Sequence, residues 1–184
     1  ELAFAHIYRP ENLGSGKSLM LSGVNRSDDL FMYVRKILTT EDGLKPNTTY
    51  LVRFSVEFAT DAPAGAFGIG GPPGEAVWVK VGASAIEPLP VSDNDPYHPA
   101  WTTSVDKGQQ NEDGEHALRV GDVAKVDNDE FGVYEVKTLD NRDLPLEVTS
   151  DAEGNLWIFV GTDSGFEGRT TLYYTNIAVQ LLEK

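Results

Sequence analysis

Residues 48–60 read TTYLVRFSVEFAT, and their hydrophobicity alternates with a period of two. The side chains of one parity are all apolar: Tyr50, Val52, Phe54, Val56 and Phe58. Three of the four side chains between them are polar or charged, namely Arg53, Ser55 and Glu57. Because successive residues of a β-strand point to opposite faces, this alternation is typical of a strand with one buried face. The segment therefore predicts a half-buried strand.

The same period recurs along the chain. Val77, Val79 and Val81 alternate with Trp78 and Lys80. The stretch 171–181 alternates β-branched and aromatic residues in the manner of a long C-terminal strand. Residues 28–37 (DDLFMYVRKI) could also form a helix, but their β-branched and aromatic content favours a strand. Further strands are expected near 17–23, 30–38, 131–138 and 155–161.

Turn residues separate the predicted strands. Residues 68–74 read GIGGPPG, which is too rich in Gly and Pro for a regular element. Many short strands with polar turns and almost no helix predict an all-β fold with two antiparallel sheets, most simply a jelly-roll sandwich. We expect one domain over residues 1–184. Residues 87–117 are expected to form a long irregular loop at one edge of the sandwich, which carries function if any loop does.

Composition excludes several classes of function. The chain has 29 acidic and 15 basic residues and a formal net charge of -14, which argues against nucleic acid or an anionic membrane surface as a partner. Cysteine is absent, so disulfides, zinc fingers and thiol nucleophiles are excluded. No apolar run approaches the ~20 residues of a transmembrane helix. The chain begins at Glu1 rather than Met, as expected of a processed or trimmed chain.

Three short stretches combine a strand with a recognisable turn or ending. Residues 16–23 read GKSLMLSG, residues 43–50 read GLKPNTTY, and residues 173–179 read YYTNIAV. They resemble the early strand, the turn into the central strand and the closing strand of jelly-roll carbohydrate-binding modules from bacterial glycan-degrading proteins. Those modules belong to the galactose-binding-like sandwiches. The resemblance implies a jelly roll, and it bears more on fold than on ligand.

The resemblance has two further implications. Asn176 stands where such modules often place an acidic residue that helps to hold a structural calcium, so this calcium site is in question here. The stretches NRSDDLFMYV and GIGGPPGEAVWVKVGAS resemble a group of secreted bacterial proteins and lipoproteins without an assigned activity. That resemblance implies an extracytoplasmic location, either secreted or anchored at the surface as a lipoprotein.

Aromatic side chains are the candidate ligand-binding residues. Flat aromatic faces stack on pyranose rings, and nearby polar groups bind the hydroxyls. If Val77 and its neighbours face the core, Trp78 and Lys80 point to the opposite face. Tyr97 and Trp101 lie together in the 87–117 loop. Alternatively, these rings cover the edges of the core. Trp157 lies in a continuous apolar run and is expected in the core.

Dense acidic clusters are candidate calcium sites. Asp93 and Asp95 flank an asparagine, and Asp127 and Asp129 flank another. Oxygen-rich clusters of this kind suit calcium, but neither has the spacing of an EF-hand loop. Asp and Asn are equally typical of exposed turns. We therefore expect that no cofactor is required and that calcium is optional.

No catalytic signature stands out. The three histidines form no His-x-His pair of the kind that jelly-roll metalloenzymes use. Glu57 and Glu75 could in principle act as a pair of glycosidase carboxylates, but Arg53 lies on the same face as Glu57, which favours a surface ion pair.

The sequence is compatible with three functions. The favoured hypothesis is an exported, non-catalytic binding module with carbohydrate as its ligand class. The alternative is a structural or protein-interaction domain of a cell-surface protein. A glycan hydrolase or lyase is the least favoured.

Overall fold

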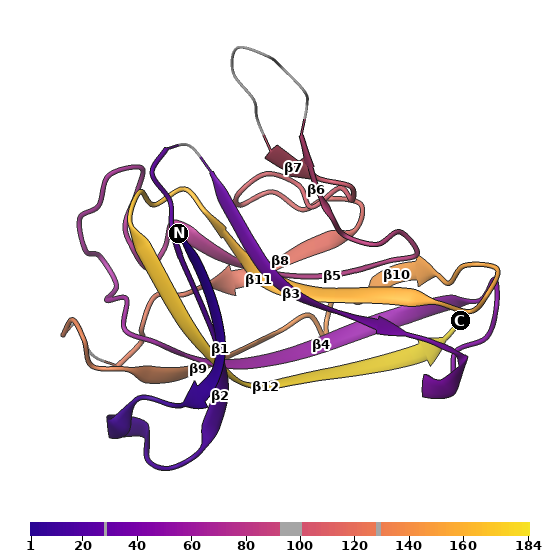
Figure 1. Cartoon of the computed structure of the whole chain (residues 1–184), viewed down its shortest axis with the longest axis horizontal. Helices are drawn as coiled ribbons and strands as arrows, with labels where there is room; N and C mark the ends of the chain where they lie inside the picture. The colour runs from indigo at the N-terminus through magenta and orange to yellow at the C-terminus, as the bar shows by residue number, and fades with distance from the viewer. Residues whose placement is uncertain (28, 93–100, 128–129) are drawn as a thin grey trace.

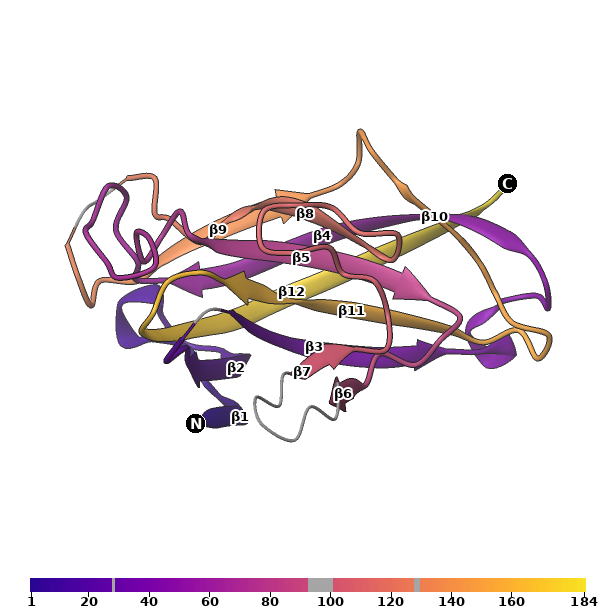
Figure 2. The same ribbon diagram turned by 90° about the horizontal axis from the view of Figure 1, so that it is seen from above.

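A computed structural model describes residues 1–27, 29–92, 101–127 and 130–184, and it shows two β-sheets packed face to face (Figures 1 and 2). Within these residues the larger sheet has six strands, in the order β1 (Leu2–Tyr8), β2 (Lys17–Val24), β12 (Arg169–Glu183), β4 (Thr49–Thr60) and β10 (Leu146–Thr149), with β9 (Glu135–Asp140) also paired to β4. The smaller sheet has the order β3 (Leu30–Leu38), β11 (Leu156–Ser164), β5 (Val77–Ser84) and β8 (Ala117–Asp122).

The remaining described elements are small. The strands β6 (Pro90–Ser92) and β7 (Trp101–Thr103) pair with each other, and two 3₁₀ turns span Glu11–Leu13 and Thr40–Asp42. All strand pairs are antiparallel. The predicted all-β, two-sheet antiparallel jelly-roll sandwich is therefore confirmed. In the described part of the chain no helix is long and apolar enough to span a membrane.

The alternating segments predicted from sequence form the core between the two sheets. Val52, Val56 and Phe58 on β4 are fully buried, and Phe54 nearly so. They belong to the same apolar cluster as the valines at 77, 79 and 81 on β5. The predicted parity of both strands is confirmed, since the valine face of β5 points into the sandwich. The 30–38 segment is also a strand rather than a helix, as its β-branched and aromatic content favours.

One buried amide joins two strands that run end to end along the same edge of β4. β9 pairs with residues 55–60 and β10 with residues 49–52. In the gap between them, Asn141 accepts a hydrogen bond from the Phe54 N–H (2.6 Å) and donates one to the Val52 carbonyl (3.1 Å). The asparagine side chain thus replaces the missing backbone partners of β4 at this point.

The outer face of the smaller sheet is covered by residues 104–116, which we call the cover segment. Val105 of this segment packs with Ala117 and Phe159 in a second, smaller apolar cluster. The ring of Phe159 lies directly over Gly82, where a Cβ atom would come within 2.1 Å of it. Gly82 therefore allows the ring to lie flat on the sheet beneath the cover segment.

This arrangement corrects two expectations. The 87–117 region was expected at one edge of the sandwich, but the cover segment crosses the sheet face as far as the interior strand β11. Trp157 was expected in the core, yet it is half-buried on the outer face, 5.1 Å from the guanidinium of Arg35. Trp157 lies on the outer face because its neighbours Leu156 and Ile158 point into the core, and successive residues of a strand point to opposite faces.

Candidate functional site

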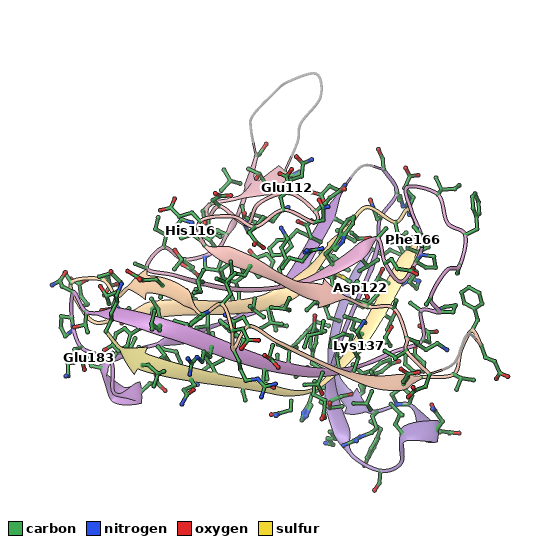
Figure 3. All side chains as sticks on the ribbon, turned by 180° about the vertical axis from the view of Figure 1, so that it is seen from behind. Glu112, His116, Asp122, Lys137, Phe166 and Glu183 are labelled. Atoms are coloured by element: carbon green, nitrogen blue, oxygen red, sulfur yellow. The ribbon has the colours of Figure 1, made fainter. Side chains whose placement is uncertain are left out.

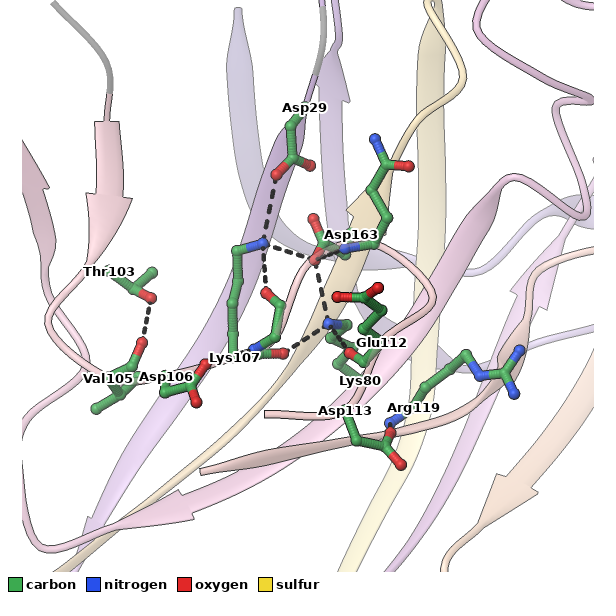
Figure 4. A network of polar contacts seen from close by, with 12 residues as sticks. Asp29, Lys80, Thr103, Val105, Asp106, Lys107, Glu112, Asp113, Arg119 and Asp163 are labelled. Carbon is green, nitrogen blue, oxygen red and sulfur yellow. Dashed lines mark hydrogen bonds and ion pairs between the residues drawn. The ribbon is translucent and has the colours of Figure 1, made fainter. Parts of the chain in front are cut away.

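A cluster of charged side chains lies beneath the cover segment (Figure 4). Lys80 on β5 and Asp163 on β11 are both fully buried, with 3.3 Å between the Nζ and Oδ2 atoms. The Lys80 ammonium also donates hydrogen bonds to the backbone carbonyls of Lys107 (2.6 Å) and Glu112 (2.8 Å). A buried ammonium needs such partners, because an unpaired charge in the interior is costly. Lys80 therefore ties the cover segment to the sheet.

Lys107 extends the cluster toward solvent. Its Nζ lies 2.7 Å from Asp163 Oδ2 and 3.3 Å from Asp29 Oδ2. The same ammonium is 5.2 Å from the centre of the Phe31 ring, within the range of a cation–π contact. The backbone N–H of Gln110 also donates to Asp163 Oδ2 (2.9 Å). One carboxylate oxygen thus receives contacts from two lysines and one amide.

These contacts shift the pKa values of the cluster. Burial and the neighbouring Asp163 carboxyl raise the pKa of Asp29 to about 6, against the opposing effect of Lys107. Burial lowers the pKa of Lys80, although Asp163 opposes the shift. The pKa of Asp163 is lowered despite its burial, because Asp29 and the two lysines stabilise the charged form.

The cover segment is held in shape by its own hydrogen bonds. The Asp106 carboxylate accepts from the backbone N–H groups of Gly108 (2.9 Å) and Glu115 (3.0 Å), and these bonds lower the pKa of its carboxyl group. His116 Nδ1 accepts a hydrogen bond from the Asp106 N–H (3.2 Å). The segment is therefore a closed, anchored loop rather than a free one.

A groove of about 480 Å³ runs beside this cluster. It is lined by Asp29 and the continuous stretch 101–109, and we call it the Trp101 groove. Trp101, on β7, is 72% exposed. Asp106 and Gln109 also line the groove. An exposed indole beside carboxylates and an amide is suited to a ligand with one apolar face and several hydroxyl groups.

The structure separates the ligand-binding residues predicted from sequence. Trp101 lines the groove. Trp78 is half-buried on the outer face of β5, opposite Asp163 in the strand register. Lys80 was predicted on an open face, and that exposure is wrong, since its side chain is fully enclosed between the sheet and the cover segment. Tyr97 lies outside the described residues.

Three of the four calcium candidates, Asp93, Asp95 and Asp129, also lie outside the described residues. Asp127 is exposed, and its backbone N–H bonds to the Glu135 carboxylate. Among the residues that the structure describes, no three His, Cys, Asp or Glu side chains come together as a metal site.

The two glutamates considered for catalysis each have another partner. The Glu57 carboxylate accepts a hydrogen bond from Thr175 Oγ1 (2.6 Å), at a bulge in β12. Glu57 and Arg53 are both described, and they do not form the predicted ion pair. Glu75 accepts from the Gly65 N–H (2.6 Å) and so fixes a loop.

Sequence reasoning did not identify Lys107, Asp106 or Gln109 as groove residues. Asp29 was not identified either. One signal was available, because Lys80 interrupts the valine and glycine residues of β5, and a lysine in such a strand requires a partner when the strand is covered. The identity of that partner could not be read from local sequence.

Other cavities lie elsewhere in the described part of the chain. One, of about 560 Å³, opens between the two sheets beside β3 and β12 and has a mainly apolar lining that includes Phe4, Val34 and Val179. Another, of about 210 Å³, is lined by residues that include Phe166, whose side chain is labelled in Figure 3. Its lining includes Phe67, which is 95% exposed.

The sequence matches no family model and no curated protein. Solved structures resemble the chain at low identity. A chain described with the promiscuous specificity of carbohydrate-binding modules of the β-sandwich superfamily is 14% identical, with a TM-score of 0.37 over 99% of this chain and 54% of that one. This chain therefore spans about half the length of that relative.

Two other solved structures show similar values. A family 16 carbohydrate-binding module is 14% identical, with a TM-score of 0.35 over 97% of this chain and 86% of that module. The carbohydrate-binding module CBM28, described as specific for non-crystalline cellulose, is 11% identical, with a TM-score of 0.33 over 97% of this chain and 80% of that module.

Proposed function

We propose that this protein is an exported, non-catalytic binding module and that it holds a carbohydrate in the Trp101 groove. The observation that carries the proposal is the exposed Trp101 ring on a polar groove of about 480 Å³. Tryptophan is enriched at binding interfaces, because its large ring buries much apolar surface while its N–H group can still form a hydrogen bond.

The groove combines an apolar surface with hydrogen-bonding groups, and this combination suits a sugar ring. The Trp101 indole provides a flat apolar face for the C–H groups of a pyranose. The carboxylates of Asp29 and Asp106 can accept hydrogen bonds from hydroxyl groups, and Gln109 can both donate and accept. The acidic character of the groove favours a neutral or cationic glycan over an anionic one.

Part of the groove wall is packed and hydrogen-bonded, and such preorganisation lowers the entropic cost of binding. Val105 and Lys107 lie within its lining and are themselves buried, so the groove wall is part of the packed structure. Ser104 adds to this by donating to the Glu87 carbonyl (2.6 Å) and accepting from the Leu89 N–H (2.9 Å). The base of the β6–β7 hairpin is thereby fixed to the chain that precedes it.

The test is a glycan-array screen followed by titration calorimetry of the best ligand with the wild type and two variants. Trp101→Ala should weaken binding by at least about tenfold, since stacking contributes on the order of 1.4 kcal/mol or more. Phe67→Ala is the matched control, because it removes another exposed aromatic ring that does not line the groove. Its affinity should equal that of the wild type.

Unchanged affinity of Trp101→Ala, or loss of affinity in Phe67→Ala alone, would place the ligand elsewhere. If no glycan binds at all, the alternative of a structural or protein-interaction domain would stand. The export part of the proposal rests on the resemblance of two sequence stretches to secreted proteins. It is tested by locating the native protein with an antibody in separated cell fractions, and a cytoplasmic location would contradict it.

A further inference from the structure

The first strand of the chain forms one edge of the larger sheet. β1 pairs with β2 in an unbroken register from Leu2↔Gly23 to Tyr8↔Lys17. Among the described residues no strand pairs with its other side (Figure 1). The N–H and C=O groups on that side are therefore available to another strand, which makes an unprotected edge a site of association.

β1 lacks the features that normally protect such an edge. Its sequence, LAFAHIY, contains no Lys, Arg, Asp, Glu, Pro or Gly, and its register contains no bulge. The other edge strands of the two large sheets each carry charged residues, such as Arg35 on β3, Lys137 on β9 and Glu147 on β10. Edge strands of monomeric proteins usually carry charges, prolines or bulges that prevent pairing.

Most side chains of β1 are apolar and exposed. Leu2, Phe4 and Tyr8 are 68%, 62% and 73% exposed, respectively. Phe4 also lines the apolar cavity between the two sheets, so the exposed surface of β1 continues into that cavity. Exposed apolar patches of this kind mark interaction surfaces.

We propose that β1 pairs with β1 of a second copy of this chain, antiparallel and about a two-fold axis at Ala5. In this register the numbers of two paired residues add up to ten, so Ala5 of one copy faces Ala5 of the other. Leu2 would then face Tyr8, and Phe4 would face His6. Both are apolar or aromatic cross-strand pairs, which stabilise antiparallel sheets. A two-fold interface requires a self-complementary surface of this kind.

Charge complementarity favours this register and this partner. Glu1 and Arg9 flank β1, and the same register places Glu1 of each copy opposite Arg9 of the other, where it would add a second cation to the Arg169 guanidinium that lies 3.0 Å from the Glu1 carboxylate within its own chain. With a net charge of -14, two copies repel each other over most of their surfaces. Two copies can approach each other most closely at β1, which is uncharged and has opposite charges at its two ends.

The first experiment measures the mass in solution by light scattering over a concentration series. The wild type should be a dimer, and more so at higher salt, because salt screens the repulsion between two acidic chains. Ala5→Lys would place two ammonium groups directly opposite each other at the axis, so its mass should fall to that of a single chain. Ala178→Lys is the matched control: Ala178 is exposed on β12 of the same sheet, and this variant should stay dimeric.

The second experiment uses the absence of cysteine from the chain. Under mild oxidation, Ala5→Cys should cross-link to its own copy, and an equal mixture of Leu2→Cys and Tyr8→Cys should give the mixed product. Directly paired residues bring their Cβ atoms to about 4.5–5.5 Å, close to disulfide geometry. Ala178→Cys should remain uncross-linked.

A monomeric wild type at every concentration would overturn the proposal, and so would a dimer that Ala5→Lys leaves intact. Cross-linking of Leu2→Cys with itself, without the mixed product, would show parallel pairing and contradict the register. The cysteine variants keep the proposal testable even if Ala5→Lys fails to fold. Glycan binding in the Trp101 groove does not depend on any of these outcomes.

Discussion

Lys80 and Asp163 form an ion pair, 3.3 Å between Nζ and Oδ2, in which neither side chain is exposed to solvent. The pair connects β5 to the neighbouring strand β11. Because Lys80 also bonds two carbonyls of the cover segment, one side chain joins three parts of the chain. The Trp101 groove exists only while the cover segment lies on the sheet, so this charged cluster stabilises the groove. Asp29 and Lys107 also line the groove, whereas Lys80 and Asp163 do not.

Replacing Lys80 by methionine should destabilise the protein strongly. The substitution removes one of the two ammonium groups that stabilise the charge of the buried Asp163. It also leaves the carbonyls of Lys107 and Glu112 without their hydrogen-bond donor. Breaking a buried pair costs about 3–5 kcal/mol. Urea unfolding measures the loss. Lys184→Met is the control, because its pair with Glu147 is exposed and should be worth no more than about 1 kcal/mol. Equal stability of the two variants would contradict this account.

Asp29 should give a pH-dependent contribution to stability of unusual sign. Its pKa is about 6 in the folded chain, above the ~3.9 of an unfolded chain. Between these values the folded state binds the extra proton, so protonation favours folding. The stability of the wild type relative to Asp29→Asn should therefore fall as the pH rises from about 4 to about 6, and stay level above that.

The measurement is urea unfolding of both proteins at several pH values from 4 to 8. Asp140 provides the control of opposite sign, because its interactions with Arg142 lower its pKa. The stability of the wild type relative to Asp140→Asn should be present above about pH 4 and should decrease as the pH falls below it. If the stability differences of Asp29→Asn and Asp140→Asn from the wild type change in the same direction with pH, the proposed environment of Asp29 is wrong.

Asn141→Ala should weaken the junction of β9, β10 and β4. It removes the partners of the Phe54 N–H and the Val52 carbonyl at a buried position. Each buried group left without a partner costs about 1–3 kcal/mol. Thermal and urea unfolding should both report the loss. Asn176→Ala, at an exposed position on β12, should change stability by no more than about 0.5 kcal/mol. A neutral Asn141→Ala would mean that water replaces the amide.

Removing calcium should have little effect on stability. Asp127, the one described calcium candidate, is exposed and its backbone bonds to Glu135. Thermal melts with excess calcium and with a chelator should therefore nearly coincide. A ligand at a hundred times its dissociation constant stabilises by about 2.7 kcal/mol, which would raise the melting temperature by roughly ten degrees. A shift of that size would establish a calcium site.

The sequence alone predicted most of the regular structure, because alternation is a local property of the chain. The period of two in 48–60 predicted β4 within one residue at its start, and the valines at 77, 79 and 81 identified the core face of β5. A side chain of known parity must point to one of two faces, so the core face follows once the apolar parity is seen.

Only the tertiary structure decided what happens on the opposite face. Trp78 and Lys80 share a parity, yet Trp78 is half-exposed while Lys80 is fully buried. The difference arises because residues 107 and 112 of the cover segment lie over Lys80, more than twenty residues away along the chain. Local sequence determines which way a side chain points, whereas its burial, charge partners and pKa depend on which distant segment packs against it.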